Sequence, residues 1–440
     1  MSGSKVMVPA PAARTRTRRL PRSVGFAVAT AILVLFQAAS SAPAPLYVVY
    51  QRQWGFSSAT LTLIFAIFVF GLLSSLLVLG ALSDYLGRRP VLAAAIALEA
   101  AAMLLFLLAG DVTMLLIARV VQGVATGMVL PALGAALVDF DPPHAPGRAA
   151  LVNGVVPIGG LALGALVCSS LAQYAPDPTH LVWALLLGAM VLAFLAVLAL
   201  PGPSARQPGV ARSLVPRLGV PRRLRGEVCA LVPIIVASWA LGGLYLSLGP
   251  SVAVTVFGVA SRFFAGLVVT LLCGTGAVTA FALRGWSAAA VLRISMTLLA
   301  VGTALTLLGM LTGSEAAAVA GTMVSGIGYG ASGLAAFGTI AKLAGPAGAV
   351  ERSELFAVAY TVAFLAYSLP AVAAGYATTR VGLHTTVAVY SVLVIFIALA
   401  AFGIQEIRSS RGTPLRIERP VGNPTRKTGA RHVPRRMPGS

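Results

Sequence analysis

The sequence predicts an all-α integral membrane protein with twelve transmembrane helices arranged as two pseudo-symmetric six-helix bundles. Three observations carry this prediction. The chain of 440 residues is 58% hydrophobic and only 10% charged, with a mean hydropathy of +0.91, whereas soluble proteins carry about 25% charged residues. Apolar runs long enough to cross a bilayer, about 20 residues each, recur along the chain. Two short sequence patterns also repeat at one fixed spacing, which indicates a duplicated unit.

The apolar runs account for most of the chain. Each is predicted to be a helix, because lipid cannot satisfy the hydrogen bonds of an irregular backbone. The predicted runs are at about 24–48, 59–83, 90–109, 113–138, 149–173, 181–200, 228–248, 259–283, 287–312, 315–341, 353–378 and 382–405.

The repeat divides these runs into two halves. Residues 54–58 resemble 257–261, and residues 119–127 resemble 322–330, so both pairs are 203 positions apart. Parallel halves of this kind place a substrate site between them near the bilayer midplane. The expected organisation, in full, is a bundle over 23–200, a cytoplasmic linker over 201–226, a second bundle over 227–406, and disordered basic tails over 1–22 and 407–440.

Orientation follows from the basic residues. With the N-terminus in the cytoplasm, 28 of the 32 Lys and Arg residues fall on the cytoplasmic side and Arg119 falls within the membrane, so that only Arg52, Arg262 and Arg380 fall outside. This asymmetry predicts that both termini are cytoplasmic. The expected location is a cell membrane, specifically a bacterial inner membrane. The net charge of +20 then reflects anionic lipid headgroups rather than nucleic acid.

The start of the chain allows a second interpretation. Arginines between Arg14 and Arg22 precede the first apolar run, and Ala42-Pro-Ala44 resembles a signal-peptide cleavage site. A retained first helix is favoured, because cleavage would leave an odd number of spans and break the two-half pattern.

A charged loop separates the second and third apolar runs. Its sequence, Gly80-Ala-Leu-Ser-Asp-Tyr-Leu-Gly-Arg-Arg89, resembles the signature that follows the second helix of major facilitator superfamily transporters, roughly G-x-L-x-D-x-x-G-R-R/K. The residues that match this signature are Gly80, Leu82, Asp84, Gly87, Arg88 and Arg89. The resemblance implies the twelve-helix fold of that family and transport by alternating access.

The resemblance also implies a role for the loop charges. Asp84 lies beside Arg88 and Arg89, and Asp139 and Arg148 are expected at the same level of the membrane. In the family, such charges form a latch that favours one access state and opens in the other. The alternative is topogenic charge together with a simple turn.

Two further polar residues lie within apolar runs. Arg119-x-x-Gln122-Gly resembles the family's fourth-helix motif, and the resemblance implies an arginine linked to proton coupling; the alternative is a structural arginine that bonds to backbone carbonyls. Glu99 is the carboxylate deepest in any run. It is a candidate proton carrier, a neutral acid bonded to a neighbour, or a partner of Arg119, since charged groups inside a membrane are usually retained for function.

Candidates for the substrate cavity lie on the first, fourth, seventh and tenth runs, which line the path in this family. They are Gln37, Ser40, Gln122, Trp239, Tyr245 and Tyr329, with Tyr360 and Tyr367 on the eleventh run as weaker candidates. Each of them alone is a weak signal, because a lone aromatic residue in a helix more often serves packing. Pro43-Ala-Pro45 and Gly249-Pro250 occupy equivalent ends of two runs and are candidate hinges of an outer gate.

The fifth run bears on the direction of transport. It contains Gly160-Leu-Ala-Leu-Gly-Ala165, where exporters of this family often have G-x-x-x-G-P. Because alanine replaces the proline, the direction stays open. The glycines are interpreted as sites of close helix packing.

The remaining patterns argue against catalysis. The sequence contains no G-x-x-x-x-G-K-[ST] and no G-x-S-x-G, and its four histidines fall outside the middle of the runs. We expect no catalytic residues, metal or cofactor, and we interpret Cys168, Cys229 and Cys273 as small core residues. The leading expectation is a monomeric, proton-coupled exporter of a small drug-like or sugar-like molecule. Uptake of a small metabolite and a non-transporting sensor or scaffold are the alternatives.

Overall fold

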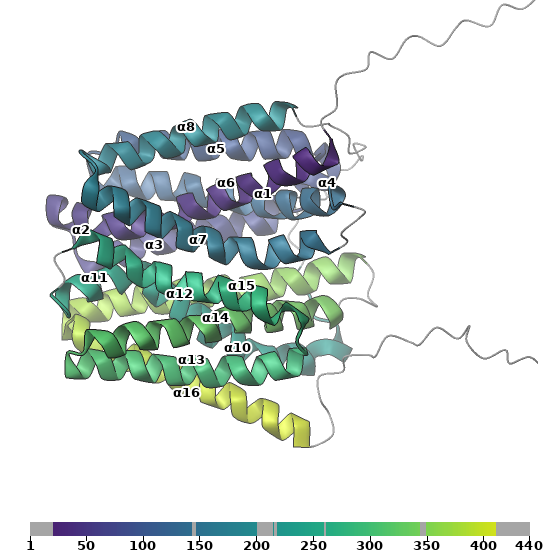
Figure 1. Ribbon diagram of the computed structural model, residues 1–440. Coiled ribbons are helices and arrows are strands. Elements are labelled where there is room, and N and C mark those ends of the chain that lie inside the picture. The colour runs from purple at the N-terminus through teal and green to yellow at the C-terminus, as the bar shows by residue number, and fades with distance from the viewer. Residues whose placement is uncertain are drawn as a thin grey trace, which may run out of the picture.

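The computed structural model describes residues 21–142, 147–199, 214, 218–258, 261–343 and 349–410. Within these ranges the secondary structure consists of helices and turns, without strands. The long helices run side by side (Figure 1), and both ends of the described chain lie on one side of the bundle, which we call the tail side. Most of the predicted tails and most of the predicted linker lie outside the described residues, so these boundaries stay predictions.

The first half of the bundle comprises the helices up to residue 199. They are α1 (Arg22–Ser41), α2 (Pro43–Trp54), α3 (Ser58–Leu79), α4 (Leu82–Leu86), α5 (Arg88–Leu107), α6 (Val112–Asp139), α7 (Arg148–Tyr174) and α8 (Pro178–Ala199).

The second half begins with the short 3₁₀ helix η1. Its elements are η1 (Arg222–Leu224), α10 (Arg225–Ser247), α11 (Gly249–Thr255), α12 (Arg262–Ala282), η2 (Leu283–Gly285), α13 (Ala288–Thr312), α14 (Glu315–Leu343), α15 (Ala349–Val381) and α16 (Leu383–Ser410). Each predicted apolar run thus corresponds to a long helix or to a pair of consecutive helices.

The two helix pairs arise where proline interrupts an apolar run. Pro43 is the first residue of α2, and Pro250 is the second residue of α11. Proline lacks the amide hydrogen that an uninterrupted helix would use, so it is tolerated in a first turn. Both breaks lie on the side opposite the tails (Figure 1), which is where the sequence predicted hinges.

Eleven helical segments in the described part of the chain are long and apolar enough to cross a membrane. The tenth predicted span, α14, is 29 residues long but is not among them. Glycine, serine and threonine dilute its hydropathy. The same residues allow close packing, and α14 contacts α10, α12 and α13.

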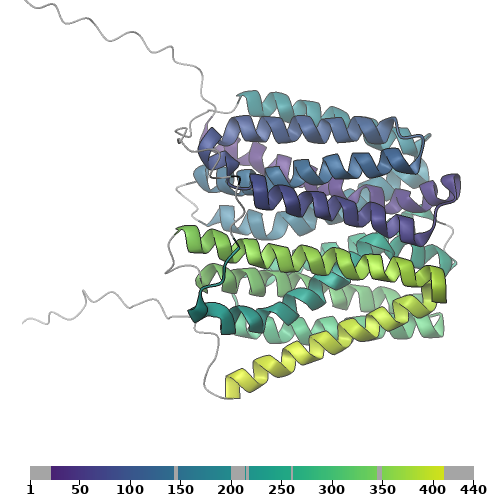
Figure 2. The ribbon, with the colours of Figure 1, turned by 180° about the vertical axis from the view of Figure 1, so that it is seen from behind.

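The halves meet along two seams. One lies between α7 and α12 (Figure 1), and the other between α3 and α15. Figure 2 shows α15, in yellow-green, at the boundary between the two groups of helices.

The interpretation of the three cysteines as core residues is wrong for one of them. Cys168 and Cys273 are buried, whereas Cys229 is exposed on α10. The reason is that a membrane helix is apolar on all sides, so its sequence does not distinguish the lipid-facing side from the packed side.

We expect Gly330→Ala to destabilise the fold. A Cβ atom on Gly330 would overlap the carbonyl group of Gly276 on α12, whereas a Cβ on Gly338 of the same helix would meet nothing within 4 Å. Overpacking of this kind costs about 1–3 kcal/mol. Thermal unfolding in detergent should therefore show a lower midpoint for Gly330→Ala and no loss for the control Gly338→Ala. Equal midpoints for the two variants would contradict this.

Candidate functional site

A chain of buried polar side chains crosses the first half of the protein. It is centred on Arg119 of α6, which is 2% exposed. The guanidinium Nε of Arg119 donates to the hydroxyl oxygen of Tyr47 at 2.7 Å. Its Nη1 donates to Gln122 Oε1 at 2.6 Å and to the carbonyl oxygen of Ser40 at 3.3 Å. The charge thus lies within hydrogen-bond reach of α1, α2 and its own helix.

Gln122 connects this arginine to Glu99 of α5. Its side-chain Nε2 donates to Glu99 Oε1 at 3.0 Å and to the carbonyl oxygen of Ala39 at 3.1 Å. Gln122 and Glu99 are both fully buried. The amide therefore presents its oxygen to the cation and its nitrogen to the carboxyl group. We call Tyr47, Arg119, Gln122 and Glu99 the buried polar chain.

One oxygen of Glu99 is left over. Within the described ranges, Glu99 Oε2 is buried and makes no hydrogen bond, and no ion pair joins Glu99 directly to Arg119. An unpaired polar atom in such a place costs free energy of folding, so its presence calls for an explanation other than stability. A carboxyl group with one free oxygen can gain or lose a proton with little rearrangement of its neighbours.

Aromatic rings complete the surroundings of Arg119. Its Cζ atom lies 4.8 Å from the ring centroid of Phe68 and 5.5 Å from that of Tyr47. A cation near an aromatic ring gains electrostatic stabilisation, which is larger where water is excluded. The sequence predicted Arg119, Gln122 and Glu99 but missed Tyr47, because the proline break before α2 interrupts the helical register by which Tyr47 could have been placed on the same face.

The other candidates for the substrate cavity lie outside the buried polar chain. Gln37 donates to the carbonyl oxygen of Pro157 on α7 at 3.1 Å. In the second half, the hydroxyl of Tyr245 is 3.0 Å from the hydroxyl of Thr322. The ring of Tyr329 lies against Gly242, because a Cβ placed on that glycine would approach it to 3.0 Å.

Trp239 belongs to an aromatic cluster in the second half. Its ring centroid is 5.1 Å from Phe364, 5.6 Å from Tyr367 and 6.1 Å from Phe337. Trp239 and Phe337 are only partly buried. Tyr367 also contacts Phe65 of α3 at a centroid distance of 5.0 Å, which links the cluster to the first half.

The charged loop forms a cluster around Arg88 on the tail side. Arg88 Nη1 pairs with Asp84 and donates to the hydroxyl of Ser83 at 2.7 Å, while its Nε pairs with Asp139 Oδ2 at 3.3 Å. Gly87, which adopts φ of +93°, allows the tight turn before α5. The loop is thereby tied to the end of α6.

Arg89 and Arg148 take no part in the ion pairs described. Instead, the start of α7 is held by Asp141, whose carboxylate accepts from the amide nitrogens of Gly147 at 3.0 Å and Ala149 at 3.3 Å. The sequence interpretation missed Asp141, because it lies seven residues before α7, too far from the predicted helix to be recognised as a capping residue.

The contacts between the halves differ between the two sides of the bundle. Opposite the tails, Gln173 Oε1 of α7 accepts from the amide nitrogen of Arg262 at 2.8 Å, and Arg262 Nη1 donates to the carbonyl oxygen of Ala172 at 3.2 Å. Near the tails, each ion pair in the described ranges stays within one half. A further hydrogen bond, from the hydroxyl of Thr270 to the carbonyl oxygen of Ala162 at 3.4 Å, lies midway along α12 and α7. Among the described residues, the hydrogen bonds between the halves thus lie opposite the tails and in the middle of the bundle.

The described residues contain no group of three or more His, Cys, Asp or Glu side chains that could hold a metal ion. The buried polar chain offers one carboxylate, one amide, one phenol and one guanidinium group. Of these groups, the carboxyl group can gain or lose a proton, and the other three can orient it through hydrogen bonds.

Comparison with known proteins places this geometry in a family. No curated protein matches the sequence. One similar solved structure is a mutant of the nucleoside transporter NupG, with a TM-score of 0.66 and 13% identity; the match covers 87% of this chain and 99% of that one. Another is the human organic anion transporter MFSD10 (TETRAN), with a TM-score of 0.63 and 18% identity; the match covers 88% of this chain and 100% of that one. At these identities the likeness concerns the fold. The family model of the Major Facilitator Superfamily matches residues 28–350. The chain therefore belongs to the Major Facilitator Superfamily and is a multi-pass membrane transporter.

Proposed function

We propose that this transporter works by alternating access, exchanging protons for a small drug-like or sugar-like molecule that it exports. The observation that carries the proposal is the buried polar chain, in which the permanent charge of Arg119 is linked to a protonatable carboxyl group through Gln122. Uptake of a small metabolite is the alternative direction. The sequence around Gly160 and Gly164 favours neither.

The coupling of protons to transport follows from the net charge of the buried polar chain. Arginine stays protonated at all accessible pH values, so the net charge of Arg119 and Glu99 together is zero when Glu99 is ionised and +1 when it is neutral. Gln122 contacts both groups and the backbone of α1. A change of charge at Glu99 therefore alters the forces on α1 and α6, two of the helices that line the path in this family.

The arrangement of the halves supports alternating access. If the tail side is cytoplasmic, as the basic residues predict, the hydrogen bonds between the halves in the described part of the chain lie on the outer side and midway through the bundle. Transport then requires these contacts to break while others form near the cytoplasm. We further propose that the transporter is a monomer in a cell membrane. Both of its termini lie in the cytoplasm, and the basic residues on that side lie against anionic headgroups.

Transport into inside-out membrane vesicles tests this function. Accumulation of one member of a panel of drug-like compounds and sugars, abolished by a protonophore, is the expected result. Accumulation only in right-side-out vesicles would favour uptake. An inactive protein with a stable partner in pull-downs would favour the sensor or scaffold.

We expect Glu99→Gln to separate transport from proton coupling. Glutamine keeps the size of the side chain and the hydrogen bond to Gln122, but it cannot exchange a proton. The variant should still exchange labelled for unlabelled substrate, yet it should lose accumulation driven by a pH gradient and the pH dependence of its rate. Glu315→Gln, the same change at an exposed position of α14, is the control. An unchanged pH profile for Glu99→Gln would exclude Glu99 as the proton carrier and would favour its interpretation as a neutral structural acid.

A further inference from the structure

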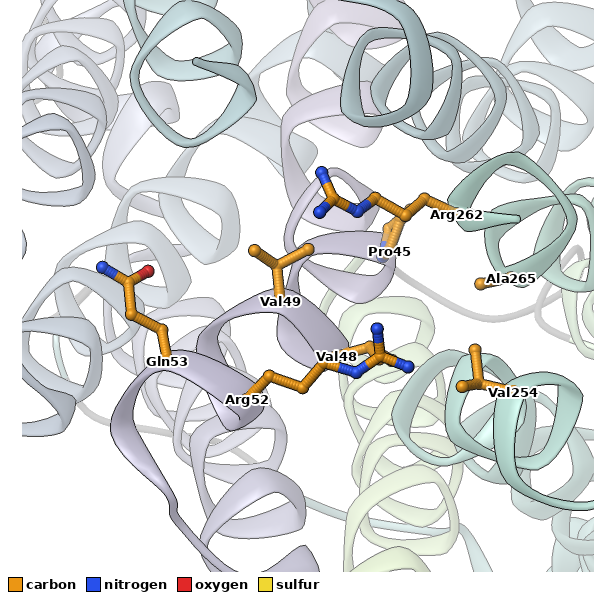
Figure 3. Close-up of a pocket in the computed structure, with 8 residues that line it drawn as sticks. All are labelled: Pro45, Val48, Val49, Arg52, Gln53, Val254, Arg262 and Ala265. Carbon is orange, nitrogen blue, oxygen red and sulfur yellow. The ribbon is translucent and has the colours of Figure 1, made fainter. Parts of the chain in front are cut away.

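A pocket lies between the halves on the side opposite the tails. Its volume is about 320 Å³, and it is bordered by α2 of the first half and by α11 and α12 of the second. The residues that line it, shown in Figure 3, are Pro45, Val48, Val49, Arg52, Gln53, Val254, Arg262 and Ala265. The pocket is thus an apolar space with two arginines and one amide, without a lining carboxylate.

The two arginines come from different halves. Arg52 lies in the last turn of α2, and Arg262 is the first residue of α12. In Figure 3, each side chain extends from its own helix toward the opposite half. The sequence predicts only three basic residues on this side of the membrane, Arg52, Arg262 and Arg380, so two of the three meet at one pocket.

The fold accounts for these two arginines only in part. Within the described ranges, Arg52 makes no hydrogen bond or ion pair, and Arg262 donates from its side chain only to the carbonyl oxygen of Ala172. The helix dipole favours Arg52, in the last turn of α2, but disfavours Arg262, in the first turn of α12. Two guanidinium groups that line one space also repel each other. An anion between them would remove both costs.

We propose that this pocket binds an organic anion. Its carboxylate would lie between Arg52 and Arg262, since the planar guanidinium group matches a carboxylate with two parallel hydrogen bonds. Its apolar part would lie against Val48, Val49 and Val254. The volume is near the lower end of ligand pockets, which span about 300–1,000 Å³, so the ligand is a compact monocarboxylate.

The position of the pocket gives binding a conformational consequence. Because Arg52 belongs to the first half and Arg262 to the second, a bound anion bridges them and stabilises the arrangement in which the halves touch on this side. It adds to the contact between Gln173 and Arg262. This site is separate from the buried polar chain and does not depend on the proposed proton-coupled export.

Binding can be measured without transport. The purified full chain in an uncharged detergent is titrated with hexanoate, and with hexanamide and hexylammonium as matched probes, by calorimetry. Hexanoate should bind, while the neutral amide and the cation should not. Arg52→Gln should weaken hexanoate binding about tenfold, the loss of one charge-assisted hydrogen-bonding partner. Arg380→Gln, at the third outer arginine, should leave it unchanged.

Arg52 is the residue to vary, because Arg262→Gln would also remove the bond to Ala172. Equal binding of hexanamide, no effect of Arg52→Gln, or an equal loss in Arg380→Gln would each overturn the proposal. The last arm repeats the titration in nanodiscs of phosphatidylglycerol. Retained hexanoate affinity supports a free organic anion, whereas complete loss would mean that a lipid headgroup occupies the pocket and would overturn the assignment.

Discussion

Arg119→Ala should abolish transport and also lower the stability of the protein. The substitution leaves Gln122 Oε1 and the Tyr47 hydroxyl without the donor they share, and each orphaned buried group costs about 1–3 kcal/mol. It also empties the space that the guanidinium group occupies beside Phe68. Both losses should appear as a lower thermal midpoint in detergent. Transport should fall at least about 100-fold, near the upper end of the roughly 5–150-fold effects that couplings between sites produce.

Arg119→Lys separates function from folding. Lysine keeps the charge but has one compact ammonium group, so it cannot bond to Tyr47, Gln122 and Ser40 in the fork geometry of arginine. We expect a folded variant with a near-normal gel-filtration profile and little transport. Arg380→Ala, which removes an exposed arginine bonded to Tyr376, is the control and should transport normally.

Two outcomes would contradict this role. Unchanged kinetics in Arg119→Ala would make the residue a structural one that only satisfies backbone carbonyls. Normal transport by Arg119→Lys would mean that charge alone is sufficient and that the bond to Tyr47 contributes nothing to the mechanism.

Much of this arrangement could be predicted from local spacing. Arg119 and Gln122 are three residues apart, so a helix places them on one face; their direct hydrogen bond follows. Asp84 and Arg88 are four residues apart and also pair, but not on one helix face, because Gly87 separates α4 from α5 between them. The helices themselves were predictable because lipid admits only long apolar helices in such a chain.

Contacts between distant elements could not be predicted in this way. Tyr47 reaches Arg119 from a helix that begins at a proline break, and no local pattern sets its rotation. The cavity candidates Trp239 and Tyr245 are six residues apart on α10, and they contact different neighbours: Trp239 the aromatic rings of α14 and α15, Tyr245 the hydroxyls of Thr306 and Thr322. An apolar helix has no polar face to reveal which neighbour each side contacts.

Asp84→Asn should leave the fold intact but strongly reduce transport. The ion pair with Arg88 is substantially exposed, with 56% of the Asp84 side chain accessible, and exposed pairs contribute about 0–1 kcal/mol to stability. Thermal unfolding should therefore change little. Transport is expected to fall more than about tenfold, because an energy difference of about 1–3 kcal/mol between the access states is enough to shift their populations 5–150-fold.

The physical reason lies in where the cluster sits. Asp84, Arg88 and Asp139 pair within the first half on the tail side, while the described hydrogen bonds between the halves lie on the other side or midway through the bundle. In the proposed alternating-access cycle, the halves close near the tails, which brings this charged loop toward the second half. Removal of the Asp84 carboxylate changes the net charge of the loop that faces the second half. It should therefore change the relative populations of the two access states rather than the stability of either bundle.

Glu351→Gln provides the matched control for this prediction. Glu351 pairs with Arg223 in an exposed position of the second half, so the variant loses a carboxylate of similar exposure at a site outside the cluster. Vesicle transport measured at matched expression should be reduced in Asp84→Asn and Asp139→Asn but retained in Glu351→Gln. Equal reductions in all three would assign the effect to surface charge in general, and full transport by Asp84→Asn would show that the cluster only orients the loop in the membrane. A selective loss in the first two variants would show that the ion pairs of Arg88 control which side of the transporter is open.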